Sequence, residues 1–380
     1  MTRWAWALVL LLLITVSHAH SRPTAGPYLL QDSAAMAEVK RGIDLMYNYQ
    51  FAEATTVFET LRPRYGKHPL YPFVHALLLY WKELPILHSS AATASLRALL
   101  EESITLAEGL RKDPDGAVEG SFFALFSHAL LAKTYADEEE TMKAVNEARK
   151  AYPYLKEGFE YQRQYAEFYI STGLYNYYRE RYPQLYPVYK PFVYFFADGN
   201  MALGLQQLEK ATREGVFTRM EAFRFLIHIY ISYEENTAKG HRLAAEAHRL
   251  YPQNTYFRMI MTETLLLTHQ YTAARPRIDA LLREDNTYYR IAAHLFDGWW
   301  QEKAAHALEA AQKAYRQAIA LQTTYRYAPD DMLGWAHAGL ARIAIVQENP
   351  DEARAQYKQA LKSTSDLSVH REAEAYLRKH

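Results

Sequence analysis

Residues 221–284 decide the fold of this chain, and they read EAFRFLIHIYISYEENTAKGHRLAAEAHRLYPQNTYFRMIMTETLLLTHQYTAARPRIDALLRE. When the stretch is aligned with itself at an offset of 34 residues, small or apolar residues fall into register at successive positions. The aligned pairs are Thr237 with Tyr271, Gly240 with Ala274, Ala244 with Ile278, and Ala247 with Leu281. Such residues at three- and four-residue spacing allow two antiparallel helices to approach closely. The stretch therefore predicts two successive helical hairpins, the first of which ends near Pro252.

A 34-residue period with this pattern is typical of tetratricopeptide repeats, which stack helical hairpins into a solenoid. No segment has a convincing strand pattern. We therefore predict an all-α fold, a single right-handed tetratricopeptide-like solenoid over residues 31–378. Its clearest repeats are residues 36–69, 221–254, 255–286 and 334–366. In such an array each repeat contacts only its neighbours, so a chain of 380 residues needs no division into several globular domains.

The first 19 residues have the organisation of a secretory signal peptide. Arg3 is basic, residues 4–16 are apolar, and residues 17–19 form a small-x-small cleavage site. The apolar run is shorter than the roughly 20 residues that span a bilayer, and an uncleaved N-terminal anchor is the alternative. Residues 20–30 are predicted to be a linker. We expect an exported protein, periplasmic or extracellular, with no integral membrane domain once the signal is removed.

Composition narrows the classes of function. Lysine and arginine total 43, as do aspartate and glutamate, so no excess of positive charge favours a nucleic-acid partner. Cysteine is absent, which excludes disulfide bonds, thiolate metal sites, cysteine nucleophiles and a lipid-modified cysteine anchor. An exported domain of this kind must be held together by packing alone.

The residues around the middle of the chain resemble one particular family. The resemblance rests on Gly173, Pro183 and Phe192, followed by Gly204-Leu205-x-x-Leu208-Glu209 and Ala211. This succession is similar to the middle segment of the tetratricopeptide repeat protein 39 family, which includes the fungal inclusion-body clearance proteins. The residues that follow match only in general repeat style, and the N-terminal third matches only as helices. The resemblance implies an all-helical adaptor without known catalytic residues, although a signal sequence and the many tyrosines depart from the eukaryotic members.

The titratable residues do not form a recognisable catalytic or metal motif. His241 and His248 are seven residues apart, and no His-x-x-x-His or His-Glu-x-x-His spacing occurs. Carboxylates that are adjacent in sequence point about 100° apart on a helix and do not face each other. Nucleophile and phosphate-loop motifs are also missing. We predict no enzymatic activity, no metal and no cofactor, although two carboxylates brought together across helices would suggest a helical hydrolase.

Tyrosine is the unusual residue of this chain, with 31 in total and twelve between residues 152 and 194. Three of these, Tyr161, Tyr165 and Tyr169, are spaced by four on a long helix that we predict over residues 157–178. Prolines at 183, 187 and 191 are expected to break the segment that follows. Tyrosines on a broken segment cannot all point inward, so some should line a surface.

The candidate binding site consists of tyrosines and arginines of this broken segment. Its residues are Tyr178, Arg179, Arg181, Tyr182, Tyr186 and Tyr189. We expect at least two of the tyrosines to line a groove together with Arg179 or Arg181, and Phe192 and Phe195 to insert into the core. Tyrosine suits both packing and binding, because its ring packs while its hydroxyl forms hydrogen bonds. The predicted partner is a peptide or a protein. The alternatives are a glycan stacked on the aromatic rings, or simple core packing.

Overall fold

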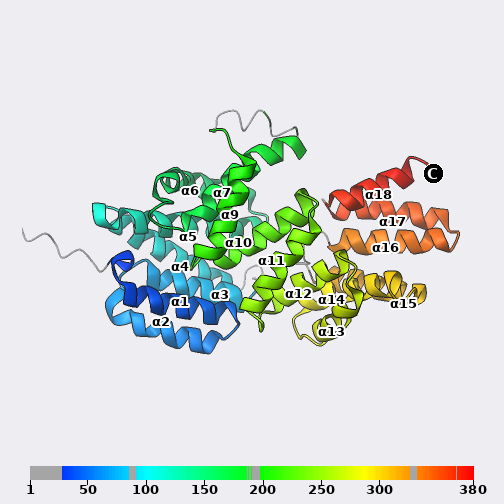
Figure 1. The fold of residues 1–380 in the computed structure, drawn as a ribbon, viewed down its shortest axis with the longest axis horizontal. Helices are drawn as coiled ribbons and strands as arrows, with labels where there is room; N and C mark the ends of the chain where they lie inside the picture. Colours follow the sequence, from blue (N-terminus) through cyan, green and yellow to red (C-terminus); the bar gives the residue numbers. More distant parts are fainter. Residues whose placement is uncertain are drawn as a thin grey trace, which may run out of the picture.

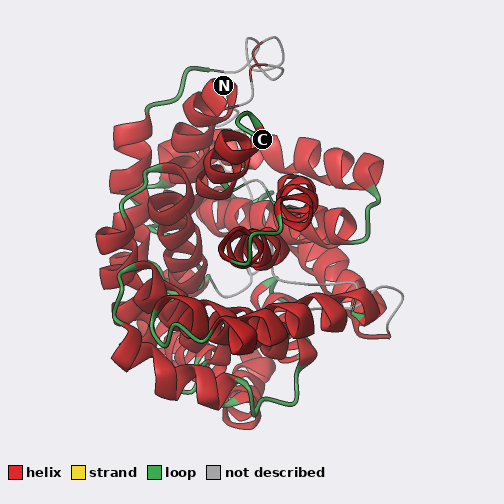
Figure 2. Ribbon diagram, turned by 90° about the vertical axis from the view of Figure 1, so that its right-hand side faces the viewer, coloured by secondary structure: helices red, strands yellow, loops and turns green. Residues whose placement is uncertain are grey.

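The computed structural model describes residues 28–84, 91–185, 197–325, 332–364 and 366–380, together with Pro187 and Lys190. Within these residues the secondary structure is helical and contains no strand (Figure 2). The predicted all-α fold is therefore confirmed. The predicted signal peptide and most of the predicted linker lie outside the described residues.

The helices follow one another with short connections and are numbered as in Figure 1. Their bounds are α1 Ser33–Tyr47, α2 Phe51–Tyr65, α3 Leu70–Lys82, α4 Ala91–Leu110, α5 Ala117–Asp137, α6 Thr141–Tyr161, α7 Phe168–Leu185, α9 Met201–Glu214, α10 Arg219–His228, α11 Thr237–Leu250, α12 Thr255–Leu267, α13 Tyr271–Leu281, α14 Thr287–Lys303, α15 Leu308–Thr324, α16 Met332–Val346, α17 Pro350–Ser363 and α18 Leu367–Leu377. A π-helix, η4 Ile229–Tyr233, extends α10, and short 3-10 turns occupy Leu29–Gln31 and Pro114–Gly116.

Each helix packs against the next one along the chain, from α1 at one end of the molecule to α18 at the other (Figure 1). The pairs α10–α11, α12–α13, α14–α15 and α16–α17 are hairpins. The first helices of successive hairpins also touch, α12 with α14 and α14 with α16. We call α10, α12, α14 and α16 the inner helices, because they share one side of the array as the inner helices of a solenoid do.

The 34-residue register is visible in the packing of α11 and α13. The last three of the four aligned positions are buried: Gly240, Ala244 and Ala247 on α11, and Ala274, Ile278 and Leu281 on α13. The first pair, Thr237 and Tyr271, is half-buried. A Cβ atom added to Gly240 would lie 2.8 Å from Cγ1 of Ile231, closer than side chains normally approach. The close helix approach predicted at Gly240 is therefore confirmed.

Side-chain caps fix where several of these helices begin. The Asp32 carboxylate accepts a hydrogen bond from the Ala35 amide and starts α1, and Asn349 does the same for α17 through the Glu352 amide. Each cap satisfies one of the backbone N–H groups that the first turn of a helix leaves without a partner. Pro350 occupies the first position of α17, where its missing N–H costs nothing.

The predicted helix over residues 157–178 is wrong. The chain instead continues α6 through Pro153 to Tyr161, turns, and starts α7 at Phe168. The turn is fixed by Glu167, which is buried and accepts hydrogen bonds from the backbone amides of residues 216–218 at the start of α10. The expected break at Pro183 is wrong as well, because α7 includes this residue and ends at Leu185. A proline removes one helical hydrogen bond, and the packing of α7 against α9 maintains the helix here.

The expectation that each repeat contacts only its neighbours is also wrong. Tyr47 at the end of α1 packs edge-on against Tyr251, with ring centroids 5.7 Å apart, and its hydroxyl donates to the carbonyl of Phe217 at 2.6 Å. The hydroxyls of Tyr49 and Tyr289 share a hydrogen bond of 2.9 Å. Aromatic side chains bury a large apolar area when they pack together. These contacts therefore close the N-terminal hairpin against the middle of the array.

Candidate functional site

A cavity of about 330 Å³ lies against the inner helices. Its wall comes from α7, from α10 with η4, from α12, α14 and α16, and from the residue that caps α18. The lining residues are Tyr178, Tyr182, Arg224, Phe225, Ile227, His228, Ile231, Ser232, Tyr233, Tyr256, Met259, Ile260, Glu263, Tyr288, Met332, Trp335 and Asp366. Four successive hairpins and α7 therefore contribute to a single cavity.

Two of the tyrosines enter the cavity from equivalent positions. Tyr256 and Tyr288 are each the second residue of their helix, and each follows an Asn-Thr pair. The carboxamide of Asn254 accepts a hydrogen bond from the Phe257 amide at 3.1 Å, and that of Asn286 accepts from the Tyr288 amide at 2.9 Å. Because both asparagines fix the first turn of their helix, the two tyrosines are presented to the same side of the array.

The turn between α10 and α11 forms another part of the wall. Its π-helix, Ile229–Tyr233, has one more residue per hydrogen-bonded turn than an α-helix and so changes which side chains face the cavity. Ser232 and Tyr233 of this turn line the cavity. The turn closes at Glu235, which has a φ of 49° in the left-handed region, while the Asn236 amide donates to the Tyr230 carbonyl at 2.7 Å.

Tyrosine rings form a small stack at the α7 side of the cavity. The rings of Tyr178 and Tyr182 are stacked with centroids 4.6 Å apart, and Tyr233 meets Tyr178 edge-on at 6.0 Å. Burial raises the pKa of the Tyr178 hydroxyl above its ordinary value, and the neighbouring Tyr182 and Tyr233 add to the effect. Tyr182 is 39% exposed. Tyr178 is therefore a packed residue, whereas Tyr182 is partly open to solvent.

Arg224 brings a positive charge to the wall, and neighbouring groups hold it in place. Its Nη1 donates to the Glu221 carboxylate at 2.8 Å, and its guanidinium carbon lies 5.0 Å from the ring centre of Tyr256 and 5.7 Å from that of Trp81. Burial on its own lowers the pKa of Arg224, but Glu221, Tyr256 and Tyr80 together hold it above its ordinary value. The charge is neutralised within the protein, so Arg224 mainly ties α10 to α12 and α3.

The structure brings together only part of the predicted tyrosine and arginine site. Tyr178 and Tyr182 line the cavity. Arg179 points elsewhere and pairs with Asp198 at 3.3 Å, while Arg181 donates to the carbonyl of Tyr233 and to Gln184. Tyr186 and Tyr189 lie outside the described residues, as do Phe192 and Phe195.

Most of the cavity wall comes from residues that the sequence did not single out. Tyr256 and Glu263 lie on α12, Tyr288 lies on α14, and Met332 and Trp335 lie on α16, so no local pattern links the three hairpins. One signal was available, however. The triplet Asn-Thr-Tyr occurs at residues 254–256 and again at 286–288, at an offset of 32 residues, which the 34-residue alignment misses. A search for repeated helix starts would have found both tyrosines.

Two carboxylates, those of Glu263 and Asp366, line the cavity. One oxygen of Asp366 accepts hydrogen bonds from the amides of Ser368 and Val369 and caps α18. Nδ1 of His241 and the hydroxyl of Thr264 share a hydrogen bond of 3.1 Å, and burial lowers the pKa of the His241 imidazole. Across the described part of the chain, no group of three or more His, Asp or Glu side chains is placed so that it could hold a metal ion.

Comparison with known proteins leaves the chain without a family. No protein-family model matches the sequence. No curated protein matches it either. Among solved structures it is similar to the tetratricopeptide repeat domain of P58(IPK), at 13% sequence identity over 90% of this chain and 97% of that one, with a TM-score of 0.26. So low a score does not establish a common overall shape, and the tetratricopeptide-like character rests on the hairpins and the register described above.

None of the helices in the described ranges combines the length and the apolar character that crossing a membrane demands.

Proposed function

We propose that this protein binds an extended peptide segment of a partner protein along its inner helices and catalyses no reaction. The observation that carries the proposal is that five helices from successive parts of the chain line one cavity. Solenoids present such inner surfaces to extended ligands, and a peptide that places a side chain in this cavity would contact several hairpins at once.

The lining favours a peptide with an apolar or aromatic anchor residue. Met259, Met332 and Trp335 are almost fully buried, and they offer a polarizable apolar surface. Phe225 and Tyr182, each more than one third exposed, stand at the edge. A volume of about 330 Å³ lies at the lower end of the range for small-ligand sites and is suited to one or two side chains rather than a folded domain. Buried aromatic anchors of this kind carry most of the binding free energy in protein interfaces.

A glycan is the second candidate, because the exposed face of Tyr182 could stack on a sugar ring. Sugar hydroxyls placed against Met259, Ile260 and Met332 would lose their hydrogen bonds to water and gain none, which costs free energy for each buried group. The lining also contains polar side chains, among them His228, Ser232 and Glu263. A peptide, which brings both apolar side chains and backbone polar groups, suits this mixed lining.

We also propose that the protein acts outside the cytoplasm, after removal of residues 1–19. The support is the arrangement of Arg3, the apolar residues 4–16 and the small residues around Ala19. The mass of the mature protein tests this proposal, because cleavage would leave His20 as the first residue. A full-length protein retained in the membrane fraction would instead show an uncleaved anchor. The resemblance to the tetratricopeptide repeat protein 39 family, which stays a prediction, supports an adaptor, whereas the signal sequence departs from the eukaryotic members of that family.

The peptide proposal is tested by selecting displayed random short peptides on the purified protein, with immobilised oligosaccharides as a parallel set. The variant Ile260→Arg places a charge inside the cavity, and Met142→Arg is the matched control on α6, where Met142 is 79% exposed. We expect selected peptides with a recurrent aromatic or large apolar residue, bound by the parent and by Met142→Arg but not by Ile260→Arg. Equal binding by all three proteins, or retention of oligosaccharides alone, would show that the cavity is not a peptide site.

A further inference from the structure

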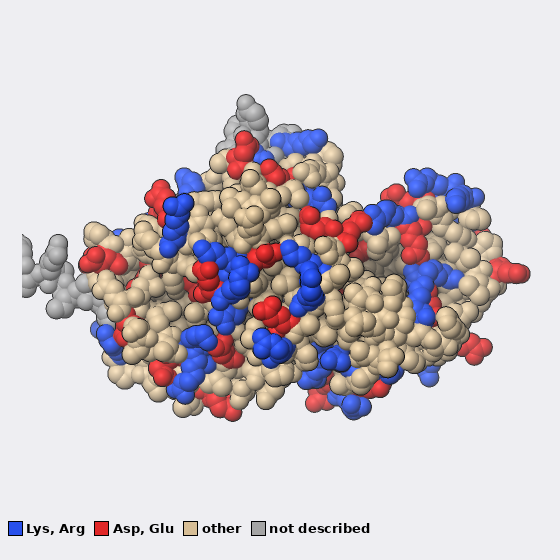
Figure 3. Space-filling view, in the orientation of Figure 1, with Lys and Arg blue, Asp and Glu red and all other residues tan. Residues whose placement is uncertain are grey.

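One ion pair joins two segments of the chain that are far apart in sequence and that each continue from residues lining the cavity. Arg371 on α18 donates from Nη1 to Oε1 of Glu235 at 2.6 Å, across 136 residues of sequence. Both side chains are more than half exposed, at 62% and 52%. On the face of the molecule that Figure 3 shows, acidic and basic side chains are closely interspersed.

The pair connects two parts of the cavity wall. Glu235 lies in the turn between α10 and α11, directly after the lining residues Ser232 and Tyr233. Arg371 lies on α18, whose N-cap residue Asp366 is also part of the lining. The contact therefore bridges the wall on the α10 side and the wall at the C-terminal end of the array, which lie next to each other in Figure 1.

On the α10 side, the turn is attached to α7. The hydroxyl of Tyr177, a fully buried residue, donates to the Glu234 carboxylate at 2.5 Å, and Arg181 donates to the carbonyl of Tyr233. These contacts keep the turn in place whether or not the ion pair is formed.

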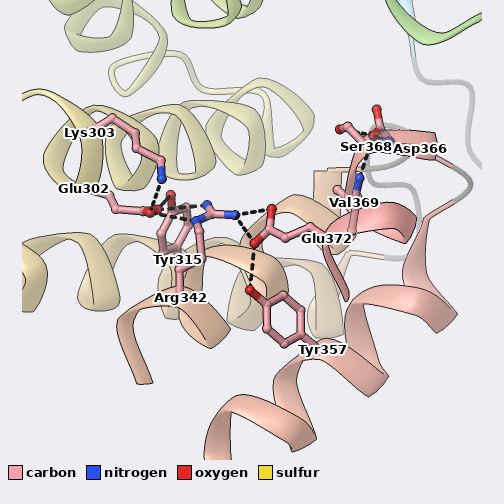
Figure 4. A network of polar contacts seen from close by, with 9 residues as sticks. All are labelled: Glu302, Lys303, Tyr315, Arg342, Tyr357, Asp366, Ser368, Val369 and Glu372. Atoms are coloured by element: carbon pink, nitrogen blue, oxygen red, sulfur yellow. Dashed lines mark hydrogen bonds and ion pairs between the residues drawn. The ribbon is translucent and has the colours of Figure 1, made fainter. Parts of the chain in front are cut away.

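On the other side, α18 is attached to α16 and α17. Figure 4 shows the guanidinium of Arg342 between two carboxylates, with Nη1 donating to Glu372 of α18 at 3.0 Å. The hydroxyl of Tyr357 on α17 donates to the same carboxylate at 2.8 Å. Each wall is thus held by partly buried hydrogen bonds, whereas an exposed ion pair connects them.

We propose that the side chains of Glu235 and Arg371 form a clasp beside the cavity, which swings open to admit the peptide and closes again once it is bound. The inference rests on the proposed function, whose site it regulates. Exposed ion pairs are weak and are screened by salt, so the clasp opens readily and its opening depends on ionic strength. A partner would then bind faster at higher salt, the reverse of ordinary electrostatic steering.

The clasp can be tested without a peptide, because the chain contains no cysteine. Ile260→Cys places a single thiol on the cavity wall, and Met142→Cys places one on the exposed surface as a control. The probe is a bulky dye-maleimide, and the measurement is the labelling rate of the full chain. Met259→Cys is a second reporter on the same helix if the first variant fails to fold.

Opening the clasp should speed the labelling of Cys at position 260 and leave the control unchanged. We expect Arg371→Glu to raise the rate about two- to fivefold, in line with the strength of an exposed pair. The exchanged double variant, Glu235→Arg with Arg371→Glu, should restore the slow rate. Added salt should speed the labelling of the parent reporter but not of the single variant.

Equal rates in all variants, or no labelling of position 260 in any of them, would overturn the clasp. This result would not affect the peptide proposal, which the selected peptides test separately. Conversely, if labelling depends on salt as expected but the protein retains no peptide, the clasp would be supported and the peptide would be ruled out as the ligand.

Discussion

The side-chain nitrogen of Asn254 donates a hydrogen bond of 2.7 Å to the backbone carbonyl of Tyr47, which lies 207 residues earlier in the chain. The same asparagine caps α12 through its carbonyl oxygen and is completely buried. One residue therefore both starts an inner helix and attaches the N-terminal hairpin to it.

Replacing Asn254 by Ser separates these two roles. Serine is an equally good N-cap but is too short to reach Tyr47, so the Tyr47 carbonyl would be left buried without its donor. We expect the free energy of unfolding to fall by about 1–3 kcal/mol, measured by urea denaturation. Asn349→Ser is the matched control, because Asn349 is an exposed cap whose change should have little effect. Equal stabilities of the two variants would show that the bond to Tyr47 contributes nothing.

Two glycines should respond in opposite ways to substitution. Gly240 has Ile231 Cγ1 2.8 Å from the position of an added Cβ, whereas Gly109 has nothing within 4 Å. Gly240→Leu and Ala274→Leu should overpack the hairpins and lower the free energy of unfolding by roughly 1–3 kcal/mol. Gly109→Ala should instead be neutral or stabilising by up to about 1 kcal/mol, because alanine favours the helix. Thermal melting distinguishes these outcomes, and unchanged melting of both leucine variants would contradict the register.

The buried carboxylate of Glu302 should make the free energy of unfolding depend on pH. Burial alone would raise its pKa, but the guanidinium of Arg342, with hydrogen bonds of 2.7 and 2.9 Å, together with Lys303 and Tyr315, holds the pKa below the ordinary value near 4.5. Because the folded pKa is lower than the unfolded one, the stabilisation is present above pH 4.5 and is lost as the pH falls through the folded pKa.

Glu302→Gln should therefore destabilise the protein at neutral pH by about 3 kcal/mol, since it leaves Arg342 without its buried carboxylate. The difference from the parent, measured by urea denaturation, should shrink as the solution is acidified below pH 4.5. Asp351→Asn removes an exposed pair with Arg354 and should change the stability by less than about 1 kcal/mol. A gap between Glu302→Gln and the parent that stays constant with pH would refute the assigned role.

Tyr178 and Tyr182 should differ although their rings are stacked. Tyr178 packs against the smaller core around α7 and α9, so Tyr178→Ala should cost about 2–4 kcal/mol of folding free energy. Tyr182 is 39% exposed, so Tyr182→Ala should weaken binding of the selected peptides while the melting temperature stays nearly unchanged. Loss of folding in Tyr182→Ala, with unaltered peptide binding, would show that this tyrosine belongs to the core.

The sequence was informative wherever a structural rule acts over short distances. The 34-residue register identified the buried positions around Gly240 and Ala274. The sequence did not reveal the role of Glu167. Its carboxylate accepts hydrogen bonds from backbone amides 49 to 51 residues away, and such a contact leaves no local pattern. The closure at Tyr47 could not be predicted for the same reason.

The candidate site was predictable only in part, and the reason is geometric. A high local density of tyrosine pointed to Tyr178 and Tyr182, which share one helix. The rest of the wall is assembled from a few residues on each of several hairpins, among them Met259 and Trp335. Their proximity depends on how the hairpins stack, which composition and spacing do not specify.

The contact between Tyr47 and the middle of the array has a consequence for the order of folding. A linear solenoid can fold hairpin by hairpin as it is synthesised, but α1 must wait for residues some 200 positions later before its aromatic side chains are covered. Contacts this distant in sequence slow folding. During that interval the N-terminal hairpin presents Tyr47 and Tyr49 to the surroundings. We expect nascent or truncated chains that end before Asn254 to require protection from aggregation.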